Sequence, residues 1–192
     1  MTQTVTASNS PSNTPSNTPS NTPSNTLGIA LFQPDMPQNC GAIMRLCACF
    51  GVPLHLIEPF GFIWDDARVR RVAMDYIEHV NLSKHQDWDK FVHTMSNAGM
   101  AAQAVAPLGA ERMAKKRLVL LSTKAATPYT DFKFQANDVL LLGRESAGVP
   151  EYVHAQVDAR VVIPLQNGMR SLNVGMSAAI VLSEAIRQIR KM

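Results

Sequence analysis

Five short apolar runs constrain the fold of this chain more than any other feature of its sequence. They are LGIALF (27–32), PLHLIE (53–58), RLVLLST (117–123), DVLLLG (138–143) and RVVIPL (160–165). Most of these runs are continuous rather than alternating, which is typical of strands that are covered on both faces. Helical patterns separate them, so we expect an α/β fold with a mainly parallel sheet flanked by helices.

The helices are predicted between the apolar runs. We expect them at 40–50, 65–73, 86–97, in a short segment after Pro150, and from Val174 to about Ile189. The first begins after Asn39, a suitable N-cap, and ends before Gly51. The last is the clearest, because its apolar residues recur at helical spacing along one face. They are Val174, Ala178, Val181, Leu182, Ala185, Ile186 and Ile189.

The first 26 residues differ from the rest of the chain. The tetrad SNTP repeats through residues 12–26, and the whole segment contains no Asp, Glu, Lys or Arg. Regularly spaced prolines block a helix, and the segment offers little apolar surface to bury. We therefore predict a disordered tail over 1–26 and a single folded domain over 27–192. A docking or phosphorylation segment rich in Ser and Thr is the alternative.

Composition limits the kind of protein without identifying it. Hydrophobic residues make up 46% of the chain, and its net charge of +3 permits an RNA partner without requiring one. Its three cysteines, Cys40, Cys47 and Cys49, form no CxxC pair, and the five histidines show no metal-ligand spacing. We expect free thiols in a reducing compartment, the cytoplasm, and no metal site. No apolar stretch is long enough to predict a membrane span or a signal peptide.

Three loops contain residues that are unusual for a purely structural role. They are NCGAIMR (39–45), LLLGRESAGVP (140–150) and IPLQNGMRSLNVGMSAAI (163–180). Individually, Asn39, Ser171 and Asn173 suit helix caps. Gly143, at the end of a strand, suits a tight turn as well as it suits close contact with a flat ligand. Because ligands bind beyond the carboxyl ends of strands in open α/β sheets, we expect all three loops to meet at one edge.

Several common chemistries lack their sequence signals. There is no GxGxxG after the first strand, as a Rossmann dinucleotide site would require. A GxxxxGK[ST] phosphate loop is also missing, and no Ser-His-Asp or Cys-His arrangement has a recognisable nucleophile elbow.

In order and spacing, the three loops resemble the three motifs of the SPOUT-class RNA 2'-O-methyltransferases. PQNCGAIMRLCACFG resembles the first motif, LLGRESAGVP the second and IPLQNGMRSLNVGMSAAI the third. The resemblance extends from Leu27 to about Gln188. Within that class, LHLIEPFGFIWDDARVRR (54–71), followed by Met74, Asp75 and Tyr76, is most similar to the enzymes that methylate the tRNA wobble nucleotide.

The resemblance implies a cofactor, a topology and an assembly. The cofactor is S-adenosylmethionine (AdoMet), the topology a C-terminal trefoil knot, and the assembly a homodimer that modifies tRNA. The implied cofactor-binding residues are Leu121, Gly143, Glu145, Gly148, Ile163, Ser171 and Asn173.

Arg45 and Asn39 are the implied catalytic pair. A guanidinium stays protonated in proteins, so we expect Arg45 to stabilise developing negative charge rather than act as a base. In this hypothesis Asn39 orients Arg45, and Glu145 anchors the second loop.

RNA binding is expected at Arg68, Arg70 and Arg71 beside Trp64. The alternative is that Trp64 belongs to the core and Arg68 pairs with Asp65 or Asp66. A second basic run, Lys115 to Arg117, is interpreted as a solvated lead-in to a strand.

Three features depart from the wobble enzymes. Ala147 stands where they usually have an arginine, SLNVGMS is closer to the broader class, and residues 98–116 look like an insertion. Another tRNA or ribosomal RNA nucleotide is therefore the alternative substrate. Two alternatives of other classes are a non-catalytic knotted RNA-binding protein and a general α/β small-molecule binder.

Overall fold

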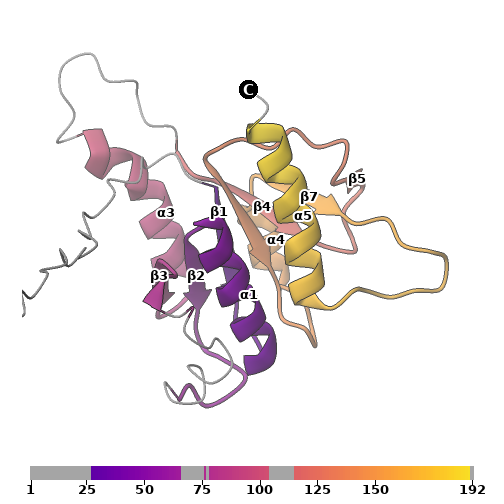
Figure 1. The fold of residues 1–192 in the computed structure, drawn as a ribbon, viewed down its shortest axis with the longest axis horizontal. Helices are drawn as coiled ribbons and strands as arrows, with labels where there is room; N and C mark the ends of the chain where they lie inside the picture. Colours follow the sequence, from indigo (N-terminus) through magenta and orange to yellow (C-terminus); the bar gives the residue numbers. More distant parts are fainter. Residues whose placement is uncertain (1–26, 66–75, 77, 104–114, 191–192) are drawn as a thin grey trace, which may run out of the picture.

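A computed structural model describes residues 27–65, 76, 78–103 and 115–190, with only the backbone of 98–103. The described elements follow one another along the chain (Figure 1). They are β1 (Gly28–Phe32), α1 (Pro37–Phe50), β2 (Leu54–Ile57), β3 (Leu82–His85), α3 (Trp88–Gln103), β4 (Arg117–Leu121), β5 (Thr127–Pro128), β6 (Asp138–Leu142), α4 (Glu151–Gln156), β7 (Ala159–Val162) and α5 (Val174–Ile189).

The strands form one sheet in the order β3-β2-β1-β6-β4-β7-β5, and every adjacent pair is parallel. This confirms the predicted parallel α/β sheet. Late in the chain, β6 inserts between β1 and β4, so the carboxyl ends of β1, β6 and β4 lie next to one another. The trefoil knot implied by the resemblance stays a prediction, because strand order alone does not describe how the chain threads.

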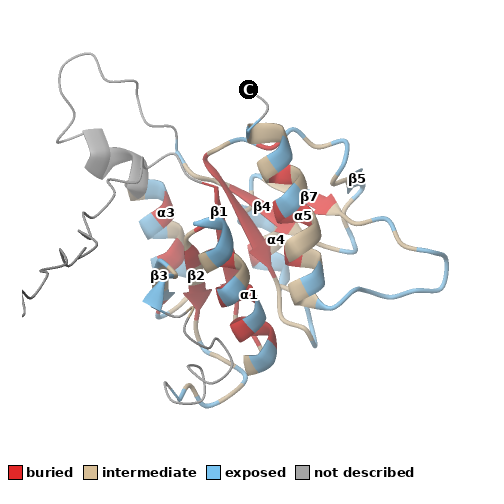
Figure 2. Ribbon diagram, viewed as in Figure 1, coloured by how far each residue is buried: buried red, intermediate tan, exposed pale blue. Residues whose placement is uncertain are grey.

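Helices cover both faces of the sheet, which explains why its strands are apolar on both sides. Ile29 and Leu31 of β1 join one core cluster, which includes residues of α1 and α5. Ala30 and Phe32, which point the opposite way, join a second cluster with Trp88 of α3 and residues of α4. Figure 2 shows the buried residues concentrated in the strands and on the inward sides of the helices. The continuous apolar runs thus mark strands that are buried on both faces.

Helix α1 begins three residues earlier than predicted. Pro37 occupies its first turn and Met36 is its N-cap, so the prediction of Asn39 as N-cap was wrong. Proline suits this position because its fixed φ matches a helix and its missing N–H has no partner there anyway. The predicted end is confirmed, since Gly51 adopts a left-handed conformation with φ 65°.

The sequence patterns missed two strands. β3 carries Ser83 and Lys84, and β5 contains Pro128 in a strand of only two residues. Both lie at the edges of the sheet, where a strand pairs on one side only and needs no continuous apolar run. The helix predicted at 65–73 lies outside the described residues except for Asp65, and α3 extends six residues beyond the predicted 86–97.

Candidate functional site

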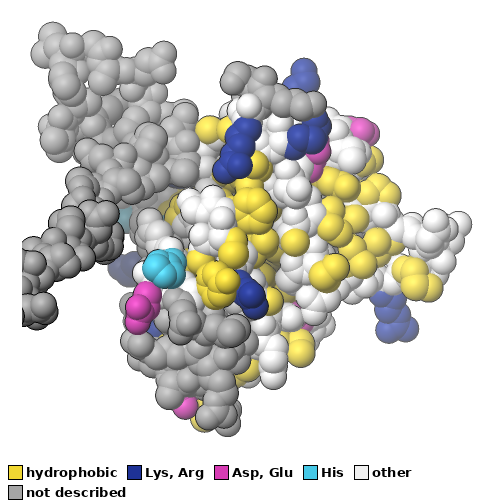
Figure 3. Space-filling model, in the orientation of Figure 1, with side chains coloured by type: hydrophobic (Ala, Val, Ile, Leu, Met, Phe, Trp, Pro, Cys, Tyr) yellow, Lys and Arg dark blue, Asp and Glu magenta, His cyan; other side chains and the backbone are white. Residues whose placement is uncertain are grey.

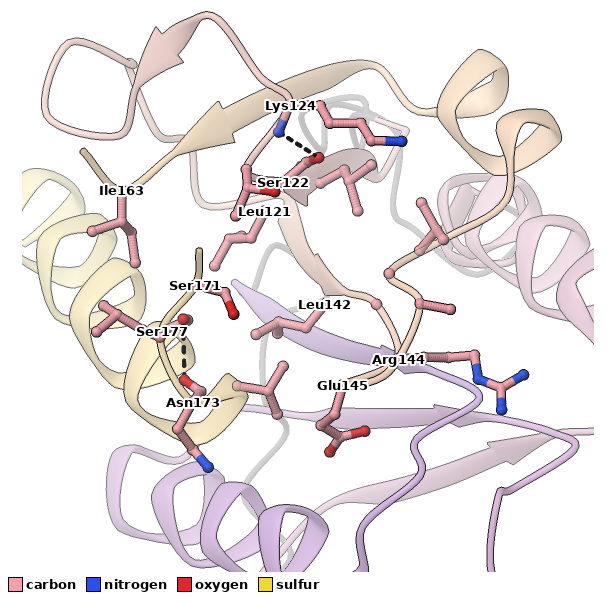
Figure 4. Close-up of a pocket in the computed structure, with 18 of the residues that line it drawn as sticks. Leu121, Ser122, Lys124, Leu142, Arg144, Glu145, Ile163, Ser171, Asn173 and Ser177 are labelled. Carbon is pink, nitrogen blue, oxygen red and sulfur yellow. Dashed lines mark hydrogen bonds between the residues drawn. The ribbon is translucent and has the colours of Figure 1, made fainter. Parts of the chain in front are cut away.

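A cavity of about 510 Å³ opens where β4, β6 and β7 end. The second and third predicted loops, together with the segment after β4, line it, and Asn39 of the first loop lies at its wall. Every residue predicted to bind the cofactor lines this one cavity. They are Leu121, Gly143, Glu145, Gly148, Ile163, Ser171 and Asn173. Figure 4 shows side chains from the second and third loops and from the segment after β4 around the same space.

The second loop is a tight turn closed by its own backbone. Arg144 and Gly148 exchange two backbone hydrogen bonds of 2.9 Å, and Gly148 has a φ of 68°. A Cβ on Gly143 would lie 2.6 Å from the carbonyl carbon of Gly148. The geometry of the turn alone therefore requires glycine at position 143. Contact between Gly143 and the cofactor stays a prediction.

A chain of polar side chains ties the three loops together. The Asn39 side-chain Nδ2 donates to Glu145 Oε1 at 2.8 Å, and its Oδ1 accepts from Asn173 Nδ2 at 3.0 Å. Asn173 Oδ1 in turn accepts from the backbone N–H groups of Gly175 and Met176, which caps α5 as predicted. Asn39 is only 6% exposed, so these bonds lie largely out of water. The described contacts of the Asn39 amide thus fix the loops, and its role in orienting Arg45 stays a prediction.

Asp35, which the sequence patterns did not single out, ties the loop before α1 to the second of these loops. Its carboxylate accepts from the Arg144 side chain and from Ser146, and its backbone N–H donates to Glu145 Oε2 at 2.8 Å. The hydrogen bond from Arg144 is the main cause of its lowered pKa, so this carboxyl stays ionised. A single Asp in a loop before a helix carries no recognisable spacing, and only the tertiary contacts reveal it.

Two cysteines of α1 are unsuited to nucleophilic chemistry. Burial raises the pKa of the Cys40 and Cys47 thiols to about 12, with the Glu145 charge adding to the effect at Cys40. A thiol with so high a pKa stays protonated near neutral pH, and the thiolate is the reactive form. Both residues serve the core beneath α1.

Arg45 is exposed on α1, and it is not among the described residues that line the cavity. Its guanidinium carbon lies 4.8 Å from the centre of the Tyr76 ring, a cation–π contact. The predicted RNA-binding residues Arg68, Arg70 and Arg71 lie outside the described residues.

Trp64 is partly buried and packs beside Phe60 and Phe62, with Lys84 Nζ 3.7 Å from its ring centre. The core interpretation of Trp64 therefore has direct support from the packing.

The described residues contain neither a candidate metal cluster nor a candidate membrane-spanning helix. No three His, Cys, Asp or Glu side chains there are grouped so that they could hold a metal ion. None of the described helices combines the length and apolarity needed to cross a membrane.

The chain matches known proteins over most of its length. The model of the SpoU rRNA Methylase family matches residues 26–183. A tRNA (cytidine(34)-2'-O)-methyltransferase of Beijerinckia indica subsp. indica is 53% identical over 161 residues, which cover 84% of this chain and 91% of the relative. The protein of the same name from Escherichia coli K12 is 34% identical, with 85% and 94% covered.

Solved structures agree with these sequence matches. A structure that gives insights into the 2-OH methylation of C/U34 on tRNA superposes with a TM-score of 0.72 at 32% identity, covering 88% of this chain and 99% of that one. The SpoU methyltransferase AviRb of Streptomyces viridochromogenes, in complex with AdoMet, has a TM-score of 0.71 at 25% identity, covering 85% and 58%. On the family match and the relative at 53% identity, this chain belongs to the SpoU rRNA methylase family.

Proposed function

We propose that this protein uses AdoMet to methylate the ribose 2'-oxygen of the wobble cytidine in tRNA. The single observation that carries the proposal is the cavity built by the second and third motif loops and joined to the first loop through Asn39. The names of relatives at 53% and 34% identity supply the substrate, tRNA cytidine 34.

The residues around the cavity fit AdoMet. Leu121, Leu142 and Ile163 offer an apolar slot for a flat base, and the cavity volume lies in the range of small-molecule sites. Lys124 and Arg170 line the same cavity and suit a carboxylate such as that of the methionine part. AdoMet, when bound, supplies a methyl group activated by a sulfonium. The loops would hold AdoMet in place, and Gly143, Gly148 and Ser171, which line the cavity, would let the backbone approach it.

Arg45 has the electrostatic role in this proposal. The ribose hydroxyl is a poor nucleophile and develops negative charge as it loses its proton during attack. A guanidinium stays protonated, so Arg45 binds the adjacent phosphate and the 2'-oxygen, while a phosphate oxygen or water takes the proton. Arg68, Arg70 and Arg71 would add phosphate contacts whose contribution weakens as salt concentration rises.

A homodimer would reconcile the position of Arg45 with this role. In one chain Arg45 lies on the exposed side of α1, so a second copy could present its own Arg45 to the cavity. Large apolar side chains remain exposed on α1 and at the start of α5, among them Phe50 at 42% and Met176 at 60%. Figure 3 shows hydrophobic side chains gathered over α1 and α5. We further propose the trefoil knot that the family resemblance implies, and a cytoplasmic location alongside tRNA.

The catalytic assignment is tested with Arg45→Ala. We expect methyl transfer to fall at least about a hundredfold, while AdoMet still binds, because the lost interaction acts at the developing charge. Arg160→Ala, which removes an exposed arginine on β7, is the matched control and should retain activity. Near wild-type transfer by Arg45→Ala, with RNA binding intact, would show that the assignment is wrong.

The substrate is tested by mass-spectrometric nucleoside analysis of tRNA from a strain lacking the protein. We expect loss of a 2'-O-methylated wobble pyrimidine. An unchanged tRNA profile would direct attention to the second candidate, another RNA ribose, which Ala147 and the rRNA description of the family favour. Calorimetry with AdoMet addresses the non-catalytic alternative, since the absence of binding would contradict the proposed enzyme.

A further inference from the structure

Asp35 occupies the junction between the loop before α1 and the second motif loop. Its side chain is 16% exposed, and its described side-chain hydrogen bonds all go to the second loop. No sequence pattern marks this residue, and it is not among those lining the cavity described above. Any influence it has on the cavity must therefore act through the loop it holds.

Three consecutive residues of the second loop are held by this one aspartate. Oδ1 accepts from Arg144 Nη2 at 2.7 Å and Nε at 3.1 Å. Oδ2 accepts from the Ser146 backbone N–H at 3.1 Å and from its hydroxyl. The Asp35 backbone N–H completes the set by donating to Glu145 Oε2 at 2.8 Å.

These contacts set the orientation of the turn relative to β1. The two hydrogen bonds between Arg144 and Gly148 close the turn but do not attach it to anything else. The bonds to Asp35 and Asn39 make that attachment, and those to Asp35 are charge-assisted, the stronger kind of hydrogen bond. In Figure 4 Arg144 extends away from Ser171 and Asn173, whereas Glu145 of the same turn lies at the cavity wall.

A third segment, which contains Gly61, also packs against Asp35. The Gly61 backbone N–H donates to the Pro34 carbonyl at 3.0 Å. A Cβ on Gly61 would lie 2.6 Å from Asp35 Oδ1 and 2.9 Å from its Cα. Because the Cα belongs to the backbone, a methyl group at Gly61 has to displace the loop that carries Asp35.

We propose that Asp35 is a positioning residue that holds the second loop in the geometry that binds AdoMet. The proposal rests on the proposed function, because it assumes that AdoMet occupies this cavity. An Asn at this position keeps the shape of the side chain but replaces one acceptor oxygen by a donor, which faces either Arg144 or the Ser146 N–H. The turn then loses part of its attachment to the loop before α1. AdoMet binding must return the second loop to its binding geometry, and the affinity falls accordingly.

The test compares Asp35→Asn with the wild-type protein by calorimetric titration with AdoMet. We expect the Kd to rise about tenfold, in line with the loss of a hydrogen bond to a charged group. In turnover assays KM for AdoMet should rise similarly, while kcat at saturating AdoMet changes less than about threefold. Asp89→Asn, the same chemical change at an exposed position on α3, is the matched control and should bind like the wild type.

Two further variants keep the test independent of the stability of Asp35→Asn. Arg144→Gln removes the partner at a guanidinium that is 38% exposed, and Gly61→Ala displaces Asp35 sterically. Both should weaken AdoMet binding while the thermal transition stays cooperative.

The outcomes separate this inference from the function on which it rests. A wild-type protein that fails to bind AdoMet overturns the proposed function itself. If the wild type binds and the three variants bind with equal affinity, the positioning role is wrong. A lower kcat with unchanged KM would also overturn it, because that result places Asp35 in the chemical step.

Discussion

The hydrogen bonds of Asn39 predict that Asn39→Asp destabilises the protein less at acidic pH than at neutral pH. Acid usually lowers the free energy of unfolding, so the expected pH dependence has the opposite sign. Asn39 donates to Glu145 Oε1 at 2.8 Å and accepts from Asn173, with only 6% of its surface exposed. Asn39→Asp keeps the shape of the side chain but replaces the donating amide by an oxygen. At neutral pH the variant places two carboxylates in hydrogen-bonding contact within a largely buried site.

The magnitude follows from the pKa that such a pair must adopt. Two carboxylates this close cannot both ionise readily, so one pKa rises by about two to three units above its unfolded value near 4. At 1.36 kcal/mol per unit, Asn39→Asp should lose roughly 3–4 kcal/mol of unfolding free energy above about pH 7. The loss shrinks as pH falls through the raised pKa. The protonated carboxyl then donates to Glu145 and accepts from Asn173, as the amide does.

Urea denaturation at about pH 8 and about pH 5 measures the effect as a difference between variant and wild type. We expect a deficit of roughly 3 kcal/mol at the higher pH and about 1 kcal/mol at the lower. Asn81→Asp, which introduces the same charge at an exposed position, is the control and should show little deficit at either pH. An equal deficit at both pH values would refute the reasoning, because it would mean that the two carboxyl groups do not interact.

Three further predictions concern the stability of the fold. Arg117→Ala removes the guanidinium that lies 2.6 Å from Asp138, whose side chain is fully buried. The free energy of unfolding, measured by urea denaturation, should fall by about 3–5 kcal/mol, and a loss below about 1 kcal/mol would contradict a structural ion pair. Burial lowers the pKa of His55 to about 4 from its ordinary 6.5, and His85, its neighbour at 3.1 Å, adds to the shift. The stability that this neutral histidine contributes, roughly 3 kcal/mol, is present above pH 6.5 and is lost as pH falls towards 4. His55→Gln should therefore flatten this acid dependence in denaturation curves. Gly148→Ala places a side chain at a φ of 68° and should cost about 1–2 kcal/mol of stability by thermal denaturation, although a Cβ there meets open space; an unchanged transition would show that the turn does not need this conformation.

The main layers of the fold were predictable because burial on both faces of a sheet leaves a direct trace in the sequence. DVLLL becomes β6 with all five residues buried, and the spacing of apolar residues in α5 matches the buried face of that helix. The edge strands β3 and β5 left no such trace, because a strand that pairs on one side tolerates polar residues and proline. The start of α1 was misplaced because two helix-start signals, Pro37 and Asn39, compete within three residues.

At the site, the sequence determined which segments contribute and the tertiary structure decided how they interact. The three motif loops were identified from residue types and order, and the structure places their predicted cofactor-binding residues around one cavity. The partners of these residues could not be predicted. Asn39 lies more than a hundred residues from both Glu145 and Asn173, and no local pattern specifies such pairs.

Asp35 and Arg117 show the same division most clearly. In the sequence Arg117 belongs to a basic run that suits a solvated segment, an interpretation that was wrong for this residue because the fold places it against the buried Asp138. In the sequence Asp35 is an ordinary loop residue. In the fold β6 pairs with β1, and this pairing brings Arg144 and Ser146 to the Asp35 carboxylate. Hydrophobic periodicity is a local property and can be read from the sequence. The pairing of charged and polar groups depends on which strands become neighbours, and only the tertiary structure decides that.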